Sequence, residues 1–142
     1  MAGGDDALRN AKEGAEDDLE QAVRDLDDLK IDPEVDSLIG IASSGRTPYV
    51  LSGLAHAKKL GCATVGIACV SPSAMASEGN AEFMISAVTG AEVVTGSTRM
   101  KAGTATKMIL NMISTGIMIK IGKTYGNMVS RWPNSLFLWR HL

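Results

Sequence analysis

A chain of 142 residues is long enough to form one domain with a substantial core and too short to count as two. Aromatic residues make up only 4%, so a core must be built from aliphatic side chains and the eight methionines. The formal net charge of −2 hides a split, because residues 1–36 carry −9 and residues 37–142 carry +7. The scattered charges of this basic part favour a single phosphate as ligand over nucleic acid.

Targeting, membrane and metal signals are absent from the sequence. Its start lacks the cationic and apolar pattern of a secretory signal, and the most apolar stretch, residues 108–121, is too short and too polar to span a bilayer. Cys62 and Cys69 lack metal-ligand spacing and lie in or beside apolar runs. Two buried, reduced thiols are expected, with a disulfide as the lesser alternative. We therefore expect a cytoplasmic protein with no metal, no other cofactor and no membrane partner.

The first predicted element is an amphipathic helix over residues 7–29. Its apolar residues recur every three or four positions, with room for one break, and Asp5 or Asp6 can cap it. The acidic side chains of this segment are expected to form a solvated face. Glu13 and Glu16 are less settled, because they flank Gly14 and a small residue lets another backbone or a ligand come close.

Two near-continuous apolar runs, residues 37–42 and 63–69, predict buried strands of a parallel sheet. Between them a helix is expected from Pro48, which suits a first helical turn, to Leu60, with Gly61 as its stop. Strand, helix and strand predict a right-handed βαβ unit and an α/β fold. The residues of this helix expected to be buried are Val50, Leu51, Leu54, Ala57 and Leu60.

Beyond the second strand we predict a loop over residues 70–80, a weaker strand over 82–88 and a long helix over 101–122. The stripe of the long helix expected to be buried is Ala105, Met108, Ile109, Met112, Ile113, Gly116 and Ile117. Its methionines are interpreted as core filler. Residues 130–142 show no period and are expected to be poorly ordered.

A hydroxyl-rich turn joins the first strand to its helix and contains Ser43, Ser44, Gly45, Arg46 and Thr47. Free backbone N–H groups and the positive end of the helix dipole converge there, which suits an anion. Thr47 can serve as the N-cap or leave its hydroxyl for a ligand. A plain capped loop explains this turn at least as well when it is considered alone.

A second polar cluster, residues 95–104, precedes the long helix and is harder to explain by packing. It includes Ser97, Thr98, Arg99 and Lys101, and its hydroxyls, backbone amides and cations suit a phosphate monoester or a sugar. Neither cluster matches a P-loop or a dinucleotide turn, which disfavours a nucleotide. His56 lies within a helix and is expected at the surface, so no Ser/His/Asp set is available. Any catalysis should therefore use a carboxylate as acid or base.

Three segments resemble the N-acetylmuramic acid 6-phosphate etherase family: GGDDALRNAKEGAEDD, IGIASSGRTPYVLSGLAHAKKLGCATVGIAC and TGAEVVTGSTRMKAGTATKMILNMISTGIMIKIGKTYGN. This family has a sugar isomerase (SIS) domain and is related to the glucokinase regulatory protein. The similarity runs in register from about residue 3 to residue 127, and GSTRMKAGTA is its most specific motif. The resemblance implies a three-layer αβα domain with a parallel sheet, here a partial SIS domain over residues 1–129 followed by a divergent tail over 130–142.

The family resemblance also implies an activity and its residues. It implies a cytosolic homodimer of cell-wall sugar recycling that cleaves a lactyl ether to give N-acetylglucosamine 6-phosphate and D-lactate, without metal or nucleotide. The EGAED motif places the family's base at Glu16, and Glu13 is expected to have only a helix-face role. The residues that match sugar-phosphate binding positions are Ser43, Ser44, Gly45, Arg46, Thr47, Ser97, Thr98, Arg99 and Lys101.

The sequence also departs from the family pattern. The family's first strand, its GxGTSGR loop and its DASE segment with the catalytic acid have no match here, and Ser71-Pro72 replaces the usual Asn-Pro. We expect truncation at both ends and apolar sheet edges left uncovered. Two functions therefore stay open, an etherase-type lyase with activity reduced or lost and a non-catalytic sugar-phosphate-binding regulatory module.

Overall fold

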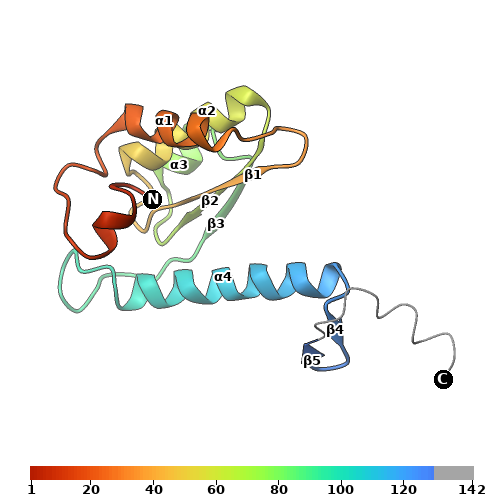
Figure 1. Ribbon diagram of the computed structural model, residues 1–142. Helices are drawn as coiled ribbons and strands as arrows, with labels where there is room; N and C mark the ends of the chain where they lie inside the picture. The colour runs from red at the N-terminus through yellow and green to blue at the C-terminus, as the bar shows by residue number, and fades with distance from the viewer. Residues whose placement is uncertain (130–142) are drawn as a thin grey trace, which may run out of the picture. The chain divides into compact units, whose positions relative to one another are not determined.

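The computed structural model describes residues 1–129 and divides the chain into two units, Met1–Thr106 and Lys107–Leu142. The expected tail over residues 130–142 lies outside the described residues. The elements, labelled in Figure 1, are η1 (Asp5–Leu8), α1 (Leu19–Leu29), β1 (Ser37–Ile41), α2 (Pro48–Leu60), β2 (Ala63–Ala68), α3 (Ala74–Ser77), β3 (Phe83–Ser86), α4 (Lys101–Lys120), β4 (Thr124–Tyr125) and β5 (Met128–Val129).

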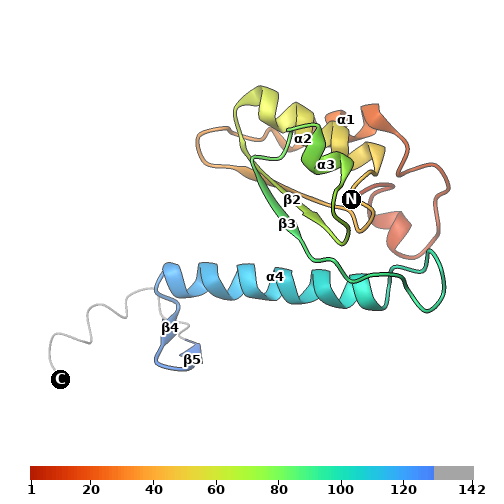
Figure 2. The ribbon, with the colours of Figure 1, turned by 180° about the vertical axis from the view of Figure 1, so that it is seen from behind.

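The first unit is built on a parallel sheet with the strand order β1-β2-β3. Ile39 pairs with Val65 across β1 and β2, and Ile67 pairs with Ile85 across β2 and β3. Helices α1, α2 and α3 lie on one face of this sheet, as Figures 1 and 2 show from opposite sides. The predicted α/β class with a parallel sheet is therefore confirmed, although the expected loop over residues 70–80 contains the short helix α3.

The core of this unit lies between α2 and the sheet. Leu54 of α2 and Met75 of α3 are fully buried and meet Ala42 at the end of β1. Burying a side chain such as Leu54 contributes about 1.5–3 kcal/mol to stability. The prediction that Leu60 is buried was wrong: it is 42% exposed, because it ends the helix beyond the edge of the packed surface.

The predicted ends of α2 are confirmed at Pro48 and Leu60, with Gly61 in the left-handed conformation as its C-cap. The predicted start of the first helix was wrong. Residues 9–18 form turns, and α1 begins at Leu19, where the Asp18 side chain accepts the N–H of Gln21. A side-chain cap competes with continuation of the helix, which explains why the apolar spacing alone misplaced its start.

The second unit contains most of α4 and the antiparallel pair β4 and β5. The predicted buried stripe was wrong, because Met108 is 56% exposed, Met112 71% and Ile117 51%. Within residues 107–129 only the two-residue strands β4 and β5 follow the helix, and they are too short to cover three turns of it. None of the helices in residues 1–129 combines the length and the apolar character needed to cross a membrane.

Candidate active site

The loop of residues 43–47 lies where β1 ends and α2 begins, at the carboxyl edge of the sheet. Ligands of open parallel sheets bind at this edge. Its Ser43 carbonyl accepts the N–H of Cys69 at 2.9 Å, and its Gly45 carbonyl accepts the N–H of Met75 at 2.9 Å. Met75 is fully buried, so the loop is attached directly to the core.

Gly45 is required by this attachment. Its φ of +61° lies in the left-handed region, and a Cβ placed on it would approach the Cβ of Ser73 to 2.5 Å. Glycine alone accepts both conditions without strain. The close approach brings the loop against the buried side chain of Ser73, which caps α3 by accepting the N–H of Ala76.

We expect Gly45→Ala to lower the free energy of unfolding by about 3 kcal/mol, because it combines backbone strain with a steric clash. Gly79 is the matched control, since its φ of +68° is similar but nothing lies within 4 Å of its Cβ position. Gly79→Ala should cost about 1 kcal/mol from strain alone. Urea denaturation of both variants measures the difference, and equal losses would show that the Ser73 contact does not constrain the loop.

The side chains of the loop are available to a ligand. In the described part of the chain, the hydroxyls of Ser43, Ser44 and Thr47 form no hydrogen bond and the Arg46 guanidinium has no carboxylate partner. Thr47 is the N-cap residue of α2 by position, but its side chain does not cap. The sequence leaves two roles open for Thr47, as an N-cap or as a ligand contact. The structure does not use its hydroxyl as a cap, so that hydroxyl stays available to a ligand.

Glu16 lies in the turn that precedes α1, and the structure brings this turn to the same place. The N–H of Tyr49, the second residue of α2, donates to the Glu16 carbonyl at 3.0 Å. The carboxylate of Glu16 is exposed, and a cleft of about 660 Å³ borders the turn. Glu13 lines this cleft from the same turn and not from a helix, so its predicted helix-face role was wrong.

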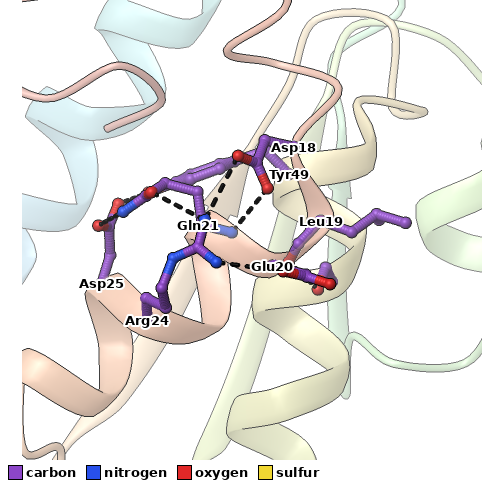
Figure 3. Close-up of polar contacts among 8 residues, drawn as sticks. Asp18, Leu19, Glu20, Gln21, Arg24, Asp25 and Tyr49 are labelled. Atoms are coloured by element: carbon purple, nitrogen blue, oxygen red, sulfur yellow. Dashed lines mark hydrogen bonds and ion pairs between the residues drawn. The ribbon is translucent and has the colours of Figure 1, made fainter.

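Polar contacts hold α1 against α2 beside this turn (Figure 3). The Tyr49 hydroxyl donates to Asp25 at 2.6 Å, and the Gln21 side-chain amide donates to the same carboxylate at 2.6 Å. These bonds lower the pKa of Asp25 below its ordinary value of 3.8. Burial and the hydrogen bond to Asp25 raise the pKa of Tyr49 to about 12. The pair is therefore a neutral phenol bonded to an ionised carboxylate at neutral pH.

Further along the same face of α2, the Ser52 hydroxyl donates to the Leu19 carbonyl at 2.7 Å, and His56 Nε2 lies 2.8 Å from Asp27 Oδ1. The expectation that His56 is a surface residue needs correction, because its side chain is partly buried against α1. A helix seen without its partner helix gives no sign of this contact.

The second cluster lies in the turns before α4. Glu92 accepts the N–H of Lys101 at 3.1 Å and that of Ala102 at 3.0 Å, and Thr98 accepts the N–H of Gly103 at 2.8 Å. The Lys101 ammonium donates to the Ala91 carbonyl at 3.0 Å. The backbone amides of Lys101, Ala102 and Gly103 are thus occupied within the protein and do not face a ligand.

Of the predicted binding residues in the second cluster, Ser97, Thr98 and Arg99 keep side chains that are available to a ligand. Thr98 and Arg99 are exposed and Ser97 is partly exposed.

Sequence reasoning missed Glu92, because a carboxylate nine residues before a helix has no fixed capping pattern. The hydrogen bond from the Ala102 amide, followed by that from Lys101, lowers the pKa of Glu92 below its ordinary value of 4.5.

The capped start of α4 should depend on pH. Because the pKa of Glu92 is lowered in the folded protein, its stabilising effect is complete above pH 4.5 and is lost as the pH falls through the folded value. The amides of Lys101 and Ala102 should lose their protection from hydrogen exchange, corrected for its intrinsic pH dependence, as the pH falls below the pKa of Glu92 in the folded protein. Glu92→Gln should show low protection at every pH, and Glu78→Gln is the control. Full protection in Glu92→Gln would contradict the cap.

Cys69 connects the two clusters within the first unit. Its N–H donates to the Ser43 carbonyl, while its Sγ lies 3.5 Å from the Ala102 carbonyl oxygen and 3.5 Å from Thr106 Oγ1. Cys69 and Cys62 are both buried and free, so the prediction of two buried, reduced thiols is confirmed. The structure brings Glu16 and the first loop together through Tyr49, and the first loop and the second cluster together through Cys69.

This parallel α/β unit with an anchored hydroxyl loop is consistent with a SIS-type domain. The family model of the glucokinase regulatory protein N-terminal SIS domain matches residues 1–58. The chain is 57% identical over 129 residues to the N-acetylmuramic acid 6-phosphate etherases of Escherichia coli O1:K1 / APEC and of Escherichia coli O45:K1 (strain S88 / ExPEC). It is 55% identical over 129 residues to the enzyme of that name from Escherichia coli O139:H28 (strain E24377A / ETEC).

These alignments include 91% of this chain and 42% of each relative. The resemblance to N-acetylmuramic acid 6-phosphate etherases is therefore confirmed over nearly the whole chain. The chain spans less than half the length of these curated relatives.

Proposed function

We propose that this chain carries part of the active site of a carbon–oxygen lyase. The reaction cleaves the lactyl ether of N-acetylmuramic acid 6-phosphate to give N-acetylglucosamine 6-phosphate and D-lactate. The observation that supports this proposal most directly is the hydrogen bond from the Tyr49 N–H to the Glu16 carbonyl. It ties the turn bearing a carboxylate to the start of α2, beside a loop suited to phosphate. The etherase name of the relatives supplies the reaction.

In this proposal the loop of residues 43–47 binds the sugar phosphate. Its hydroxyls donate to the phosphate oxygens, and Arg46 adds charge-assisted hydrogen bonds. The start of α2 contributes its positive dipole end. Ser97, Thr98 and Arg99 line the site from the second cluster, and Lys101 acts only as a fixed positive charge because its ammonium is bonded to Ala91.

The chemistry proposed is an elimination followed by addition of water. Glu16 takes the proton from sugar carbon 2, the bond between carbon 3 and the lactyl oxygen breaks, and that oxygen receives a proton from a general acid. The unsaturated, ring-opened aldehyde then adds water, with hydroxide at carbon 3 and a proton at carbon 2. The general acid is not assigned to a residue of this chain, which spans 42% of its relatives.

Calorimetry with N-acetylglucosamine 6-phosphate and an assay of D-lactate release test the two parts of this proposal. Binding together with lactate release supports it. Absence of heat up to millimolar ligand rejects the site in the isolated 142-residue chain. A cytoplasmic homodimer working in cell-wall sugar recycling is part of the same proposal, and its oligomeric state is measured by sedimentation.

A second candidate is a non-catalytic module that binds phosphorylated sugars. The match of residues 1–58 to the SIS domain of a regulatory protein favours it. The carboxylate of Glu16 discriminates the two, since a binding module has no use for a base beside its phosphate loop. Ligand binding without any lactate release, in wild type and in Glu16→Gln alike, would favour the module.

A further inference from the structure

The turn that carries Glu16 is part of a closed circuit of polar contacts. From Glu16 the circuit passes to Tyr49 through the backbone hydrogen bond of 3.0 Å, and from the Tyr49 hydroxyl to Asp25 at 2.6 Å. Asp25 accepts the Gln21 side chain at 2.6 Å, and the Gln21 N–H donates to Asp18 at 2.9 Å. Asp18 follows Glu16 by two residues, so the peptide chain itself closes the circuit. Figure 3 shows the contacts among Asp18, Gln21, Asp25 and Tyr49.

Tyr49 is the member of this polar circuit that joins α2 to the rest. Its N–H belongs to the first turn of α2, where backbone donors have no acceptor within the helix, and it is therefore free to hold the Glu16 carbonyl. Its phenol points to α1 and reaches a carboxylate that Gln21 also holds. One residue thus fixes the turn by its backbone and is itself fixed by its side chain.

Tyr49 lies close in the sequence to the phosphate loop, so its bonds link that loop to the turn that carries Glu16. It lies three residues after Arg46, so the same short segment carries the phosphate loop and the contact with the Glu16 turn. A rotation of the first turn of α2 would change the separation of carboxylate and loop. Acid and base catalysis falls steeply when a reacting group is misplaced by about 1 Å.

We propose that Tyr49 is a positioning residue that sets Glu16 against the sugar-phosphate loop, with its hydroxyl anchored on Asp25. The catalytic part of this inference rests on the proposed function. Its structural part does not, because the anchoring of the Glu16 turn can be measured without substrate.

The decisive variant is Tyr49→Phe, and Ser52→Ala is its matched control. Each removes one hydroxyl by which α2 donates to α1, but the Ser52 bond to Leu19 at 2.7 Å lies outside the polar circuit. In Tyr49→Phe we expect hydrogen exchange at the amide of residue 49 to be about tenfold faster, because the lost bond was made to a charged group. In Ser52→Ala exchange at that amide should be unchanged.

The same variants separate positioning from binding. In Tyr49→Phe, D-lactate release should fall about tenfold while affinity for N-acetylglucosamine 6-phosphate changes by less than about threefold. Asp25→Asn should act in the same direction, and the double variant should add little to either single change, as expected of residues in one network. Ser52→Ala should match wild type in turnover.

The outcomes distinguish a failure of the Tyr49 anchor from a failure of the proposed lyase function. Unchanged exchange at residue 49 in Tyr49→Phe overturns the anchor, whatever the activity shows. Equal loss of turnover in Tyr49→Phe and Ser52→Ala overturns the positioning role in favour of general helix packing. A wild-type chain that neither binds the sugar phosphate nor releases lactate rejects the proposed function, while the exchange measurement still decides the anchor.

Discussion

Replacing Glu16 with glutamine should slow D-lactate release from N-acetylmuramic acid 6-phosphate by about 10²–10⁴-fold, the range expected when a general base is removed. Affinity for N-acetylglucosamine 6-phosphate should stay within about threefold of wild type, because the amide keeps the size of the side chain and the turn is held by its backbone. The measurement is turnover by a coupled lactate assay, with calorimetry for binding.

Glu13→Gln is the control for this prediction. Glu13 is an exposed carboxylate in the same turn and borders the same cleft, but its backbone makes no contact with α2 among the described hydrogen bonds. It should retain wild-type turnover. Wild-type turnover in Glu16→Gln, or an equal loss in the two variants, would remove Glu16 from the role of base.

Arg46→Ala is expected to have the second largest effect, and it should act on binding. Removing charge-assisted hydrogen bonds to a phosphate costs about 1.5–3 kcal/mol, which corresponds to a loss of affinity of about 10–100-fold. Because Arg46 is exposed and has no ion-pair partner within residues 1–129, stability should hardly change. Calorimetry with N-acetylglucosamine 6-phosphate and a urea melt measure the two quantities.

Two further variants sharpen the Arg46 prediction. Arg46→Lys should recover only part of the affinity, since an ammonium keeps the charge but not the two-pronged geometry of a guanidinium. Lys59→Ala removes an exposed cation from the last turn of α2, at the end of the helix away from the loop, and should bind like wild type. A loss in Lys59→Ala equal to that in Arg46→Ala would indicate a nonspecific charge effect.

The sequence predicts the first unit well where residues that start or stop a helix adjoin apolar runs. Pro48 and Gly61 mark both ends of α2 by backbone chemistry, and the apolar runs on either side form paired parallel strands. Only β2 is buried as predicted, because β1 lies at the edge of the sheet and exposes Ile39 and Ile41. The first helix shows the limit of such reasoning. Its apolar spacing continues through residues 9–18, but the Asp18 cap and the left-handed Gly14 stop the helix from extending there.

Long-range contacts of the site could not be predicted from spacing. Glu92 caps a helix that begins nine residues later, and Tyr49 meets Asp25 from 24 positions away. Nothing local distinguishes these side chains from solvated ones. The loop of residues 43–47 was found because glycine, hydroxyls and a helix-starting proline occur together within a few residues. The roles of its side chains, and that of Glu16, stay predictions.

The attachment of Gly45 to buried Met75 has a consequence for recognition. A loop whose backbone is bonded to the core is already ordered before any anion arrives, so the entropy of ordering it is lost during folding and not during binding. Its donors keep fixed separations, and a ligand must match them.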